Sequence, residues 1–276
     1  MTGLLRGKRG LIMGVANDHS IAWGIAKACA GQGAELALTY QGEAFGKRVQ
    51  PLAESIGAKI LCSCDVEDLT SVDAVFETLE DAWGSLDFVV HAIAFAKKDE
   101  LKGRYADTTR ENFSRAMLIS CFSFTEVAKR AAALMTRGGS LLTLSYGGAS
   151  RVSPSYNVMG VAKAALESSV RYLAADFGPD GIRVNAISAG PVRTLAGSGI
   201  SGARFQYNFH REHSPLKRSV TIEDVGGAAI YLLSDLSGAV TGEVHFVDSG
   251  FNIVGMPQQD GLESNSTARK NQDAAE

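Results

Sequence analysis

Short apolar runs alternate with longer amphipathic segments along most of this chain. The apolar runs are almost continuously hydrophobic, as expected of strands buried on both faces of a sheet. They occupy residues 9–15, 35–40, 58–65, 86–94, 139–146, 182–188 and 242–248. The segments between them carry apolar residues at helical spacing, over residues 20–32, 43–56, 70–83, 109–136, 155–177 and 222–235. This alternation predicts an α/β protein with a seven-stranded parallel sheet and helices on both faces, the doubly wound Rossmann-type fold.

The alternation continues without a linker to about residue 256, which predicts one dinucleotide-binding domain over residues 1–256. Residues 257–276 are polar, lack aromatic residues and show no periodicity, so we expect a disordered tail there. Residues 190–220 form a long connection before the last predicted helix. A loop of this length is usually functional or disordered, and we expect it to be a lid over a substrate site.

Composition and charge exclude several classes of protein. The net charge of −3 at pH 7 provides no basic field for nucleic acid. No apolar run approaches the roughly 18 residues of a membrane span. The first ten residues lead into a strand and contain no apolar core of signal-peptide length. We therefore expect a cytoplasmic enzyme or binding protein, with neither nucleic acid nor a membrane span.

The four cysteines do not change this expectation. Cys62 and Cys64 form a C-x-C pair, but no second pair stands at zinc-finger spacing. Cys29 and Cys121 lie in helical patterns. Burial of small apolar side chains accounts for all four, and we expect neither a metal site nor a disulfide.

The first strand–helix connection has the elements of a phosphate-binding turn. Gly14 ends the strand, and the next helix opens near Ser20 and Ile21. A glycine followed by a helix N-terminus is how an α/β sheet holds a pyrophosphate. The turn is longer than in G-x-G-x-x-G, however, and an ordinary strand–helix turn explains it nearly as well. Its position at the first crossover favours the nucleotide-binding interpretation.

Polar residues follow the next two strands. Gln41 stands where NAD-binding folds often have an acidic residue and NADP-binding folds recruit an arginine. Because Gln41 is neutral, the sequence favours NADH, although Lys47 and Arg48 lie near enough to turn toward a phosphate. Asp65 ends the third strand, where a carboxylate can accept a hydrogen bond from an adenine amino group. The alternative for Asp65 is a helix cap.

Tyr156 and Lys163 stand seven residues apart in one helical pattern after the fifth strand. In a regular helix this spacing places them within about 20° of each other and about 10.5 Å apart along the axis. Most tyrosine–lysine pairs with this spacing are merely half-exposed neighbours. A position at the carboxyl edge of a nucleotide-binding sheet instead favours catalysis. Tyr146, at the end of the fifth strand, is a second candidate, or a residue that only lines the pocket.

Four stretches together resemble a known family: GVANDHSIAWGIA (14–26), FVVHAIAFA (88–96), YNVMGVAKA (156–164) and NAISAGPVRTLAGSGI (185–200). The chain resembles the NADH-dependent enoyl-[acyl-carrier-protein] reductases of bacterial fatty acid synthesis, within the short-chain dehydrogenase/reductase superfamily. The similarity covers residues 4–256. The Tyr-x6-Lys spacing is specific for the enoyl reductase branch, since most of the superfamily has Tyr-x3-Lys.

The resemblance implies reduction of the trans-2 double bond of an enoyl-acyl-carrier-protein thioester by NADH, in a homotetramer. Tyr156 would then be the phenol that protonates or stabilises the enolate, Lys163 the ligand of the nicotinamide ribose, and Tyr146 a second active-site tyrosine. The implied cofactor contacts are Gly14, Ser20, Ile21, Gln41, Asp65, Val66, Ile93, Lys163, Val192, Arg193, Thr194, Leu195 and Ala196. The implied substrate contacts are Ala96, Tyr146, Tyr156 and Met159. Two departures are Ala92, where relatives often have serine, and the pair Gly147–Gly148 in place of a bulkier residue, which could loosen the acyl pocket.

Two other functions are compatible with the same fold. One is a carbonyl or 3-oxoacyl reductase of the same superfamily, and the other is a non-catalytic nucleotide-binding protein. Tyr-x6-Lys argues against the first, and the intact pair of Tyr156 and Lys163 argues against the second. Among the histidines, we expect His91 to have a structural role in the core, and His210 and His213 to be solvated charges of the lid.

Overall fold

Seven parallel strands form one sheet in the order β3-β2-β1-β4-β5-β6-β7. The computed structural model describes residues 3–194, 197 and 202–256. The strands are β1 (Arg9–Met13), β2 (Glu35–Tyr40), β3 (Ile60–Ser63), β4 (Phe88–His91), β5 (Gly139–Tyr146), β6 (Ile182–Ala189) and β7 (Val244–Val247). The order reverses between β1 and β4, which creates the crevice where doubly wound folds bind nucleotides. The predicted fold class is confirmed, with several strands shorter than expected.

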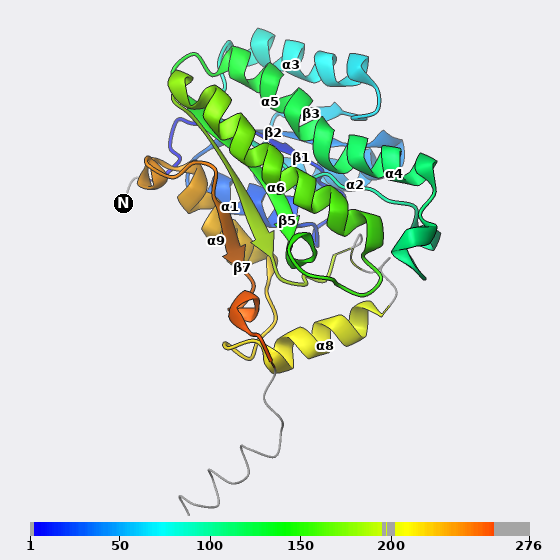
Figure 1. Cartoon of the computed structure of the whole chain (residues 1–276). Helices are drawn as coiled ribbons and strands as arrows, with labels where there is room; N and C mark the ends of the chain where they lie inside the picture. Colours follow the sequence, from blue (N-terminus) through cyan, green and yellow to red (C-terminus); the bar gives the residue numbers. More distant parts are fainter. Residues whose placement is uncertain (1–2, 195–196, 198–201, 257–276) are drawn as a thin grey trace, which may run out of the picture.

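Helices cover both faces of the sheet (Figure 1). They are α1 (Ile21–Gly31), α2 (Gly42–Ser55), α3 (Leu69–Trp83), α4 (Arg110–Met117), α5 (Ser123–Leu134), α6 (Asn157–Phe177), α8 (Ala203–His213) and α9 (Ile222–Leu233). None of the helices within the described residues combines the length and the apolar character that crossing a membrane requires.

Two hydrophobic cores lie on opposite sides of the sheet. Leu11 and Met13 of β1 pack in the core that α3, α5 and α6 cover, whereas Ile12 between them packs in the core of α1, α2 and α9. In β5, Leu141 packs in the first of these cores and Leu142 in the second. Because successive strand residues face opposite sides, a sheet buried on both faces needs an unbroken apolar run.

The helix predicted over residues 109–136 is interrupted. A π-helical turn, Leu118–Phe122, separates α4 from α5. In this turn the Ser120 hydroxyl accepts a hydrogen bond from the Phe95 N–H at 2.9 Å and donates to the Phe95 carbonyl at 3.1 Å. These two bonds connect the π-helical turn to the loop after β4, while the chain stays helical from Arg110 to Leu134. Such π turns often occur at functional sites.

The segment 190–220, which we expected to be an irregular loop, contains helix α8. Its aromatic side chains stack at helical spacing, with 5.8 Å between the ring centroids of Phe205 and Phe209 and 4.3 Å between those of Phe209 and His213. Phe209 also contacts Phe251, which follows β7. The expectation that residues 257–276 form a disordered tail concerns a part of the chain outside the described residues.

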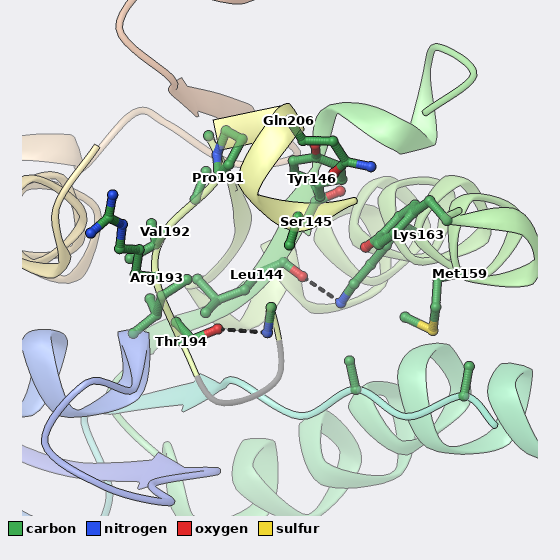
Figure 2. Close-up of a pocket in the computed structure, with 18 of the residues that line it drawn as sticks. Leu144, Ser145, Tyr146, Met159, Lys163, Pro191, Val192, Arg193, Thr194 and Gln206 are labelled. Atoms are coloured by element: carbon green, nitrogen blue, oxygen red, sulfur yellow. Dashed lines mark hydrogen bonds between the residues drawn. The ribbon is translucent and has the colours of Figure 1, made fainter. Parts of the chain in front are cut away.

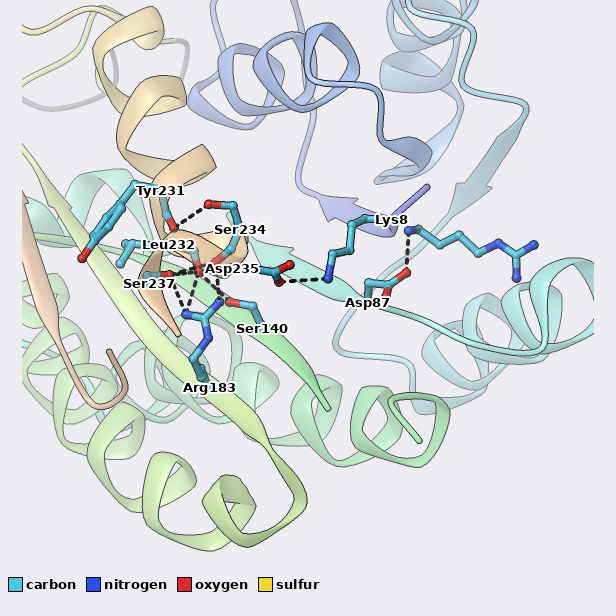
Figure 3. Close-up of polar contacts among 10 residues, drawn as sticks. Lys8, Asp87, Ser140, Arg183, Tyr231, Leu232, Ser234, Asp235 and Ser237 are labelled. Carbon is cyan, nitrogen blue, oxygen red and sulfur yellow. Dashed lines mark hydrogen bonds and ion pairs between the residues drawn. The ribbon is translucent and has the colours of Figure 1, made fainter. Parts of the chain in front are cut away.

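At the amino edge of the sheet, Arg183 of β6 binds the C-terminal end of α9 (Figure 3). Its guanidinium donates to the carbonyls of Leu232, Ser234 and Val240 and to the Ser237 hydroxyl, at 2.8–3.4 Å. Partial burial lowers the pKa of Arg183 below its ordinary value. The guanidinium thus caps carbonyl groups that a helix end leaves without helical partners.

Replacing Arg183 by methionine is expected to lower the free energy of unfolding by about 2 kcal/mol, because charge-assisted hydrogen bonds are lost. This loss of stability stays moderate, because the Leu232 carbonyl still accepts a hydrogen bond from the Ser140 hydroxyl. Lys8→Met is the control, because it removes the exposed ion pair with Asp235, worth less than about 1 kcal/mol. Urea denaturation measures both, and equal losses in the two variants would contradict the capping role.

Candidate active site

A cavity of about 900 Å³ opens at the carboxyl edge of the sheet. Its walls come from the residues that follow β4 and β6, from the last residues of β5, from the start of α1, from α6, and from α8, which closes one side (Figure 2). In doubly wound sheets ligands bind outside the carboxyl ends of the strands, at the point where the strand order reverses. The cavity lies at that edge and is large enough for a cofactor together with part of a substrate.

Most residues that the sequence singled out line this cavity. They are Ile21, Ile93, Ala96, Tyr146, Tyr156, Met159, Lys163, Val192, Arg193 and Thr194. Five others follow β1, β2 and β3 at the same edge of the sheet without forming part of the cavity wall: Gly14, Ser20, Gln41, Asp65 and Val66. Leu195 and Ala196 lie outside the described residues.

The turn after β1 leaves no room for a side chain. Gly14 has φ +89°, and a Cβ there would lie 2.3 Å from the Ala92 carbonyl oxygen. The Ser20 hydroxyl accepts hydrogen bonds from the N–H groups of Ala16 and Asn17, at 3.1 and 3.0 Å, and so closes the longer turn. Helix α1 then begins at Ile21 in the cavity wall. A glycine that lets the backbone approach closely, followed by a helix N-terminus, fits the pyrophosphate of a dinucleotide.

Gln41 and Asp65 contact each other across β2 and β3. The Gln41 amide donates to the Asp65 carboxylate at 3.1 Å, and the Asp65 carboxylate also accepts from the Glu67 N–H at 3.0 Å. Helix α3 is capped by Asp68, which accepts from the Thr70 N–H. The helix-cap alternative for Asp65 is therefore wrong, and its carboxylate instead orients Gln41 at the sheet edge.

Tyr156 is not part of the regular helix that carries Lys163. Helix α6 begins at Asn157, and the residues on either side of Tyr156 have positive φ, 59° at Ser155 and 37° at Asn157. The calculation from helical periodicity is therefore wrong for this pair. A strained turn, in which left-handed conformations are uncommon for residues other than glycine, places the phenol.

The Tyr156 ring is held between Tyr146 and a glycine. Its centroid lies 4.9 Å from that of Tyr146 in an edge-on arrangement. A Cβ on Gly148 would lie 2.5 Å from the Tyr156 ring, so this glycine allows the ring its position. Gly148, which we expected to loosen the acyl pocket, instead packs directly on the candidate acid.

Burial sets the charge states of the pair. Desolvation, reinforced by Tyr146 and Glu167, raises the pKa of Tyr156 far above the ordinary value of a phenol, so it stays protonated and able to donate. Desolvation lowers the pKa of Lys163 to about 8, leaving it mainly an ammonium at neutral pH. Lys163, 6% exposed, donates to the Leu144 carbonyl at 2.7 Å (Figure 2).

The histidines divide between core and lid. His91 is fully buried, bonds to Ser123 at 2.9 Å, and has its pKa lowered to about 3, first by burial and then by the charge of Lys163. It is a neutral core residue, as expected. The expectation of a solvated charge is wrong for His210, which is 4% exposed and packs on Phe251. Its pKa is lowered by burial.

Several residues that line the cavity were not predicted from the sequence. The unpredicted lining residues include Phe95, Leu101, Ser145, Gln206 and Tyr207. Gln206 and Tyr207 belong to α8, whose helical spacing of aromatic residues was the available signal. Ser145 follows from no local pattern, because its role depends on a partner in another element.

A doubly wound sheet whose carboxyl edge holds a half-buried phenol and a buried ammonium beside a nucleotide-type turn defines a dinucleotide-dependent oxidoreductase. The family model described as enoyl-(acyl carrier protein) reductase matches residues 14–252. The chain belongs to this enoyl-(acyl carrier protein) reductase family.

Similar proteins carry the same description. The chain is 70% identical over 262 residues to enoyl-[acyl-carrier-protein] reductase [NADH] 2 of Rhizobium meliloti (strain 1021), covering 95% of this chain and 98% of that protein. The crystal structure of the reductase from Anaplasma phagocytophilum in complex with NAD is 61% identical, with a TM-score of 0.91 and coverage of 94% and 99%. That of FabI from Candidatus Liberibacter asiaticus is 58% identical, with a TM-score of 0.92 and coverage of 94% and 100%. The resemblance found in the sequence is confirmed.

Proposed function

We propose that this chain reduces the trans-2 double bond of enoyl-acyl-carrier-protein thioesters with NADH, the last step of the fatty acid elongation cycle. The observation that carries the proposal is the pairing, in one cavity wall, of the half-buried phenol of Tyr156 with the buried ammonium of Lys163. Membership of the enoyl reductase family supports the choice of substrate.

Tyr156 acts on the thioester. Negative charge collects on the thioester oxygen when C3 of the enoyl group is reduced, and a protonated phenol donates to that oxygen. A donor aimed at a forming oxyanion is typically worth about 3–4 kcal/mol. Tyr146 packs on the phenol, while Ala96 and Met159 line the acyl side.

Lys163 and the first strand–helix turn hold the cofactor. Lys163 binds the nicotinamide ribose. The pyrophosphate lies against the turn at Gly14 and the start of α1. The adenine binds to Asp65 and Val66. When bound, NADH supplies the hydride. Ile93 and the residues from Val192 to Thr194 line the same cavity and complete the cofactor site.

The position of the phenol favours an enoyl thioester over a ketone. In a ketone the carbon that is reduced carries the oxygen that needs the donor, whereas in an enoyl thioester the oxygen is two carbons away. A tyrosine placed by its own turn ahead of α6, rather than within the helix near Lys163, suits the more distant oxygen. The 3-oxoacyl reductase alternative is therefore the weaker candidate.

A direct assay separates the two reactions. With NADH, a crotonyl thioester is expected to be reduced at least tenfold faster than an acetoacetyl thioester, measured as loss of NADH absorbance at equal substrate concentrations. Faster reduction of the acetoacetyl thioester would support the carbonyl reductase, and reduction of neither would support a non-catalytic nucleotide-binding protein.

Cofactor choice follows from Gln41 and Asp65. A 2′-phosphate near Gln41 would meet the Asp65 carboxylate that the amide contacts, so NADPH is disfavoured. Gln41→Arg is expected to raise kcat/KM with NADPH about tenfold, because an arginine pairs with phosphate. Gln41→Glu is the control and is expected to lower it. Equal kcat/KM for NADPH in the three proteins would contradict this assignment.

Assembly and location complete the proposal. Acyl carrier protein presents the thioester, and residues 190–220, with α8, act as the lid of the single domain 1–256. The chain is proposed to assemble as a homotetramer, as its resemblance to the enoyl reductase family implies. Light scattering on the purified protein measures the mass of the assembly, which is expected to be that of four chains. The cytoplasm, where NADH is available, is the proposed location.

A further inference from the structure

Glu167 lies one helical turn beyond Lys163 in α6 and is half-buried. Its carboxylate accepts a hydrogen bond of 2.5 Å from the hydroxyl of Ser145, which is 5% exposed. Residues four apart share one face of a helix, so Lys163 and Glu167 are directed toward the same end of β5. No catalytic step proposed above uses this carboxylate.

Helix α6 forms hydrogen bonds with two successive residues of β5. Lys163 donates to the Leu144 carbonyl at 2.7 Å, and Glu167 accepts from the next residue, Ser145. Both strand residues line the cavity, and Tyr146 follows them (Figure 2). The two bonds together fix the strand end from which the Lys163 ammonium and the tyrosine wall take their positions.

Several titratable groups surround Lys163. Cys121 of the π-helical turn, Glu167 of α6 and His91 of β4 interact electrostatically with Lys163. Tyr146 of β5 and Tyr156, which precedes α6, line the same cavity wall. Lys98, Arg193, Arg204 and Tyr207 line the same cavity from its other sides. Among these titratable groups, Glu167 carries the carboxylate. It opposes the desolvation that lowers the pKa of Lys163 and contributes to the raised pKa of Tyr156.

We propose that Glu167 is a positioning residue for the reductase reaction: its bond to Ser145 fixes the end of β5, and its carboxylate, one helical turn from Lys163, positions the ammonium that binds the ribose. This inference rests on the proposed role of Lys163. Removing the charge destabilises the ammonium relative to the neutral amine. The pKa of Lys163 then falls below about 8, and the lysine loses its proton at a lower pH.

Glu167→Gln tests the charge, because it keeps the size and an acceptor oxygen. The alkaline limb of the kcat/KM profile is expected to shift by about one pH unit toward lower pH. The dissociation constant of NADH, measured by fluorescence, is expected to rise several-fold at pH 8.5 and to stay unchanged at pH 6.5. Ser145→Ala is the matched control, since it removes the bond and keeps the carboxylate. It is expected to lower kcat at every pH without moving the limb.

Identical pH profiles for Glu167→Gln and the unmodified enzyme, in both turnover and NADH binding, would overturn the proposal. Glu167→Ala gives the same readout if the glutamine variant does not fold, which circular dichroism at both pH values checks. The binding measurement keeps the two proposals apart. If no enoyl thioester is reduced but NADH binding still shifts with pH in the variant, the proposed function fails and the role of Glu167 stands.

Discussion

Replacing Tyr156 by phenylalanine is expected to lower kcat for a crotonyl thioester about a hundredfold, a loss of about 2.7 kcal/mol. The substitution removes the protonated donor and keeps the ring that packs against Tyr146 and Gly148. NADH binding should change little, because the ribose is assigned to Lys163. Stopped-flow or steady-state NADH oxidation measures kcat, and fluorescence titration measures cofactor binding.

Tyr146→Phe is the matched control for this experiment. It also removes one phenolic hydroxyl from the same pair of rings, and it is expected to cost much less turnover, since Tyr146 is assigned to the pocket wall. Unchanged turnover in Tyr156→Phe, or a larger loss in Tyr146→Phe, would show that the wrong tyrosine has been identified as the donor.

Replacing Lys163 by methionine is expected to raise the dissociation constant of NADH about a hundredfold, since charge-assisted hydrogen bonds to the ribose are lost. Turnover should fall with it. Methionine fills a similar volume without a charge, and burial of the ammonium is unfavourable, as its lowered pKa shows. Loss of the bond to the Leu144 carbonyl opposes this gain, so the stability of the variant to urea should change by less than about 1 kcal/mol at neutral pH.

Lys98→Met is the control, because Lys98 also lines the cavity but is exposed. It should leave NADH binding nearly unchanged. Normal NADH affinity in Lys163→Met would contradict the assignment of the ribose to this lysine. A loss of affinity accompanied by a loss of stability would point instead to a structural role.

The sheet was predictable because its strands are buried on both faces. Leu11, Ile12 and Met13 must all be apolar when alternate residues enter opposite cores, and that continuity is visible in the sequence. The π-helical turn was not predictable, because it depends on the Ser120 hydroxyl meeting the loop after β4. Helix α8 was not predicted, because its aromatic residues pack on one another and on Phe251 after β7 rather than on the sheet.

The sequence predicted which residues form the candidate site, but it did not predict how they are arranged in space. Tyr156 and Lys163 do line one cavity, although a turn with positive φ, not helical periodicity, places the phenol. The bond between Ser145 and Glu167 joins residues 22 positions apart in two elements. No local pattern reports such a contact, because it arises only when α6 packs against β5.

Hydride from NADH is expected to reach C3 of the enoyl group, and a proton from the protein or solvent is expected to reach C2. The most direct test uses NADH deuterated at the transferring position of its nicotinamide, a crotonyl thioester and nuclear magnetic resonance of the product. One deuterium at C3 and ordinary hydrogen at C2 are expected. Deuterium at C2, or NADH oxidation without deuterium in the acyl chain, would contradict this expectation.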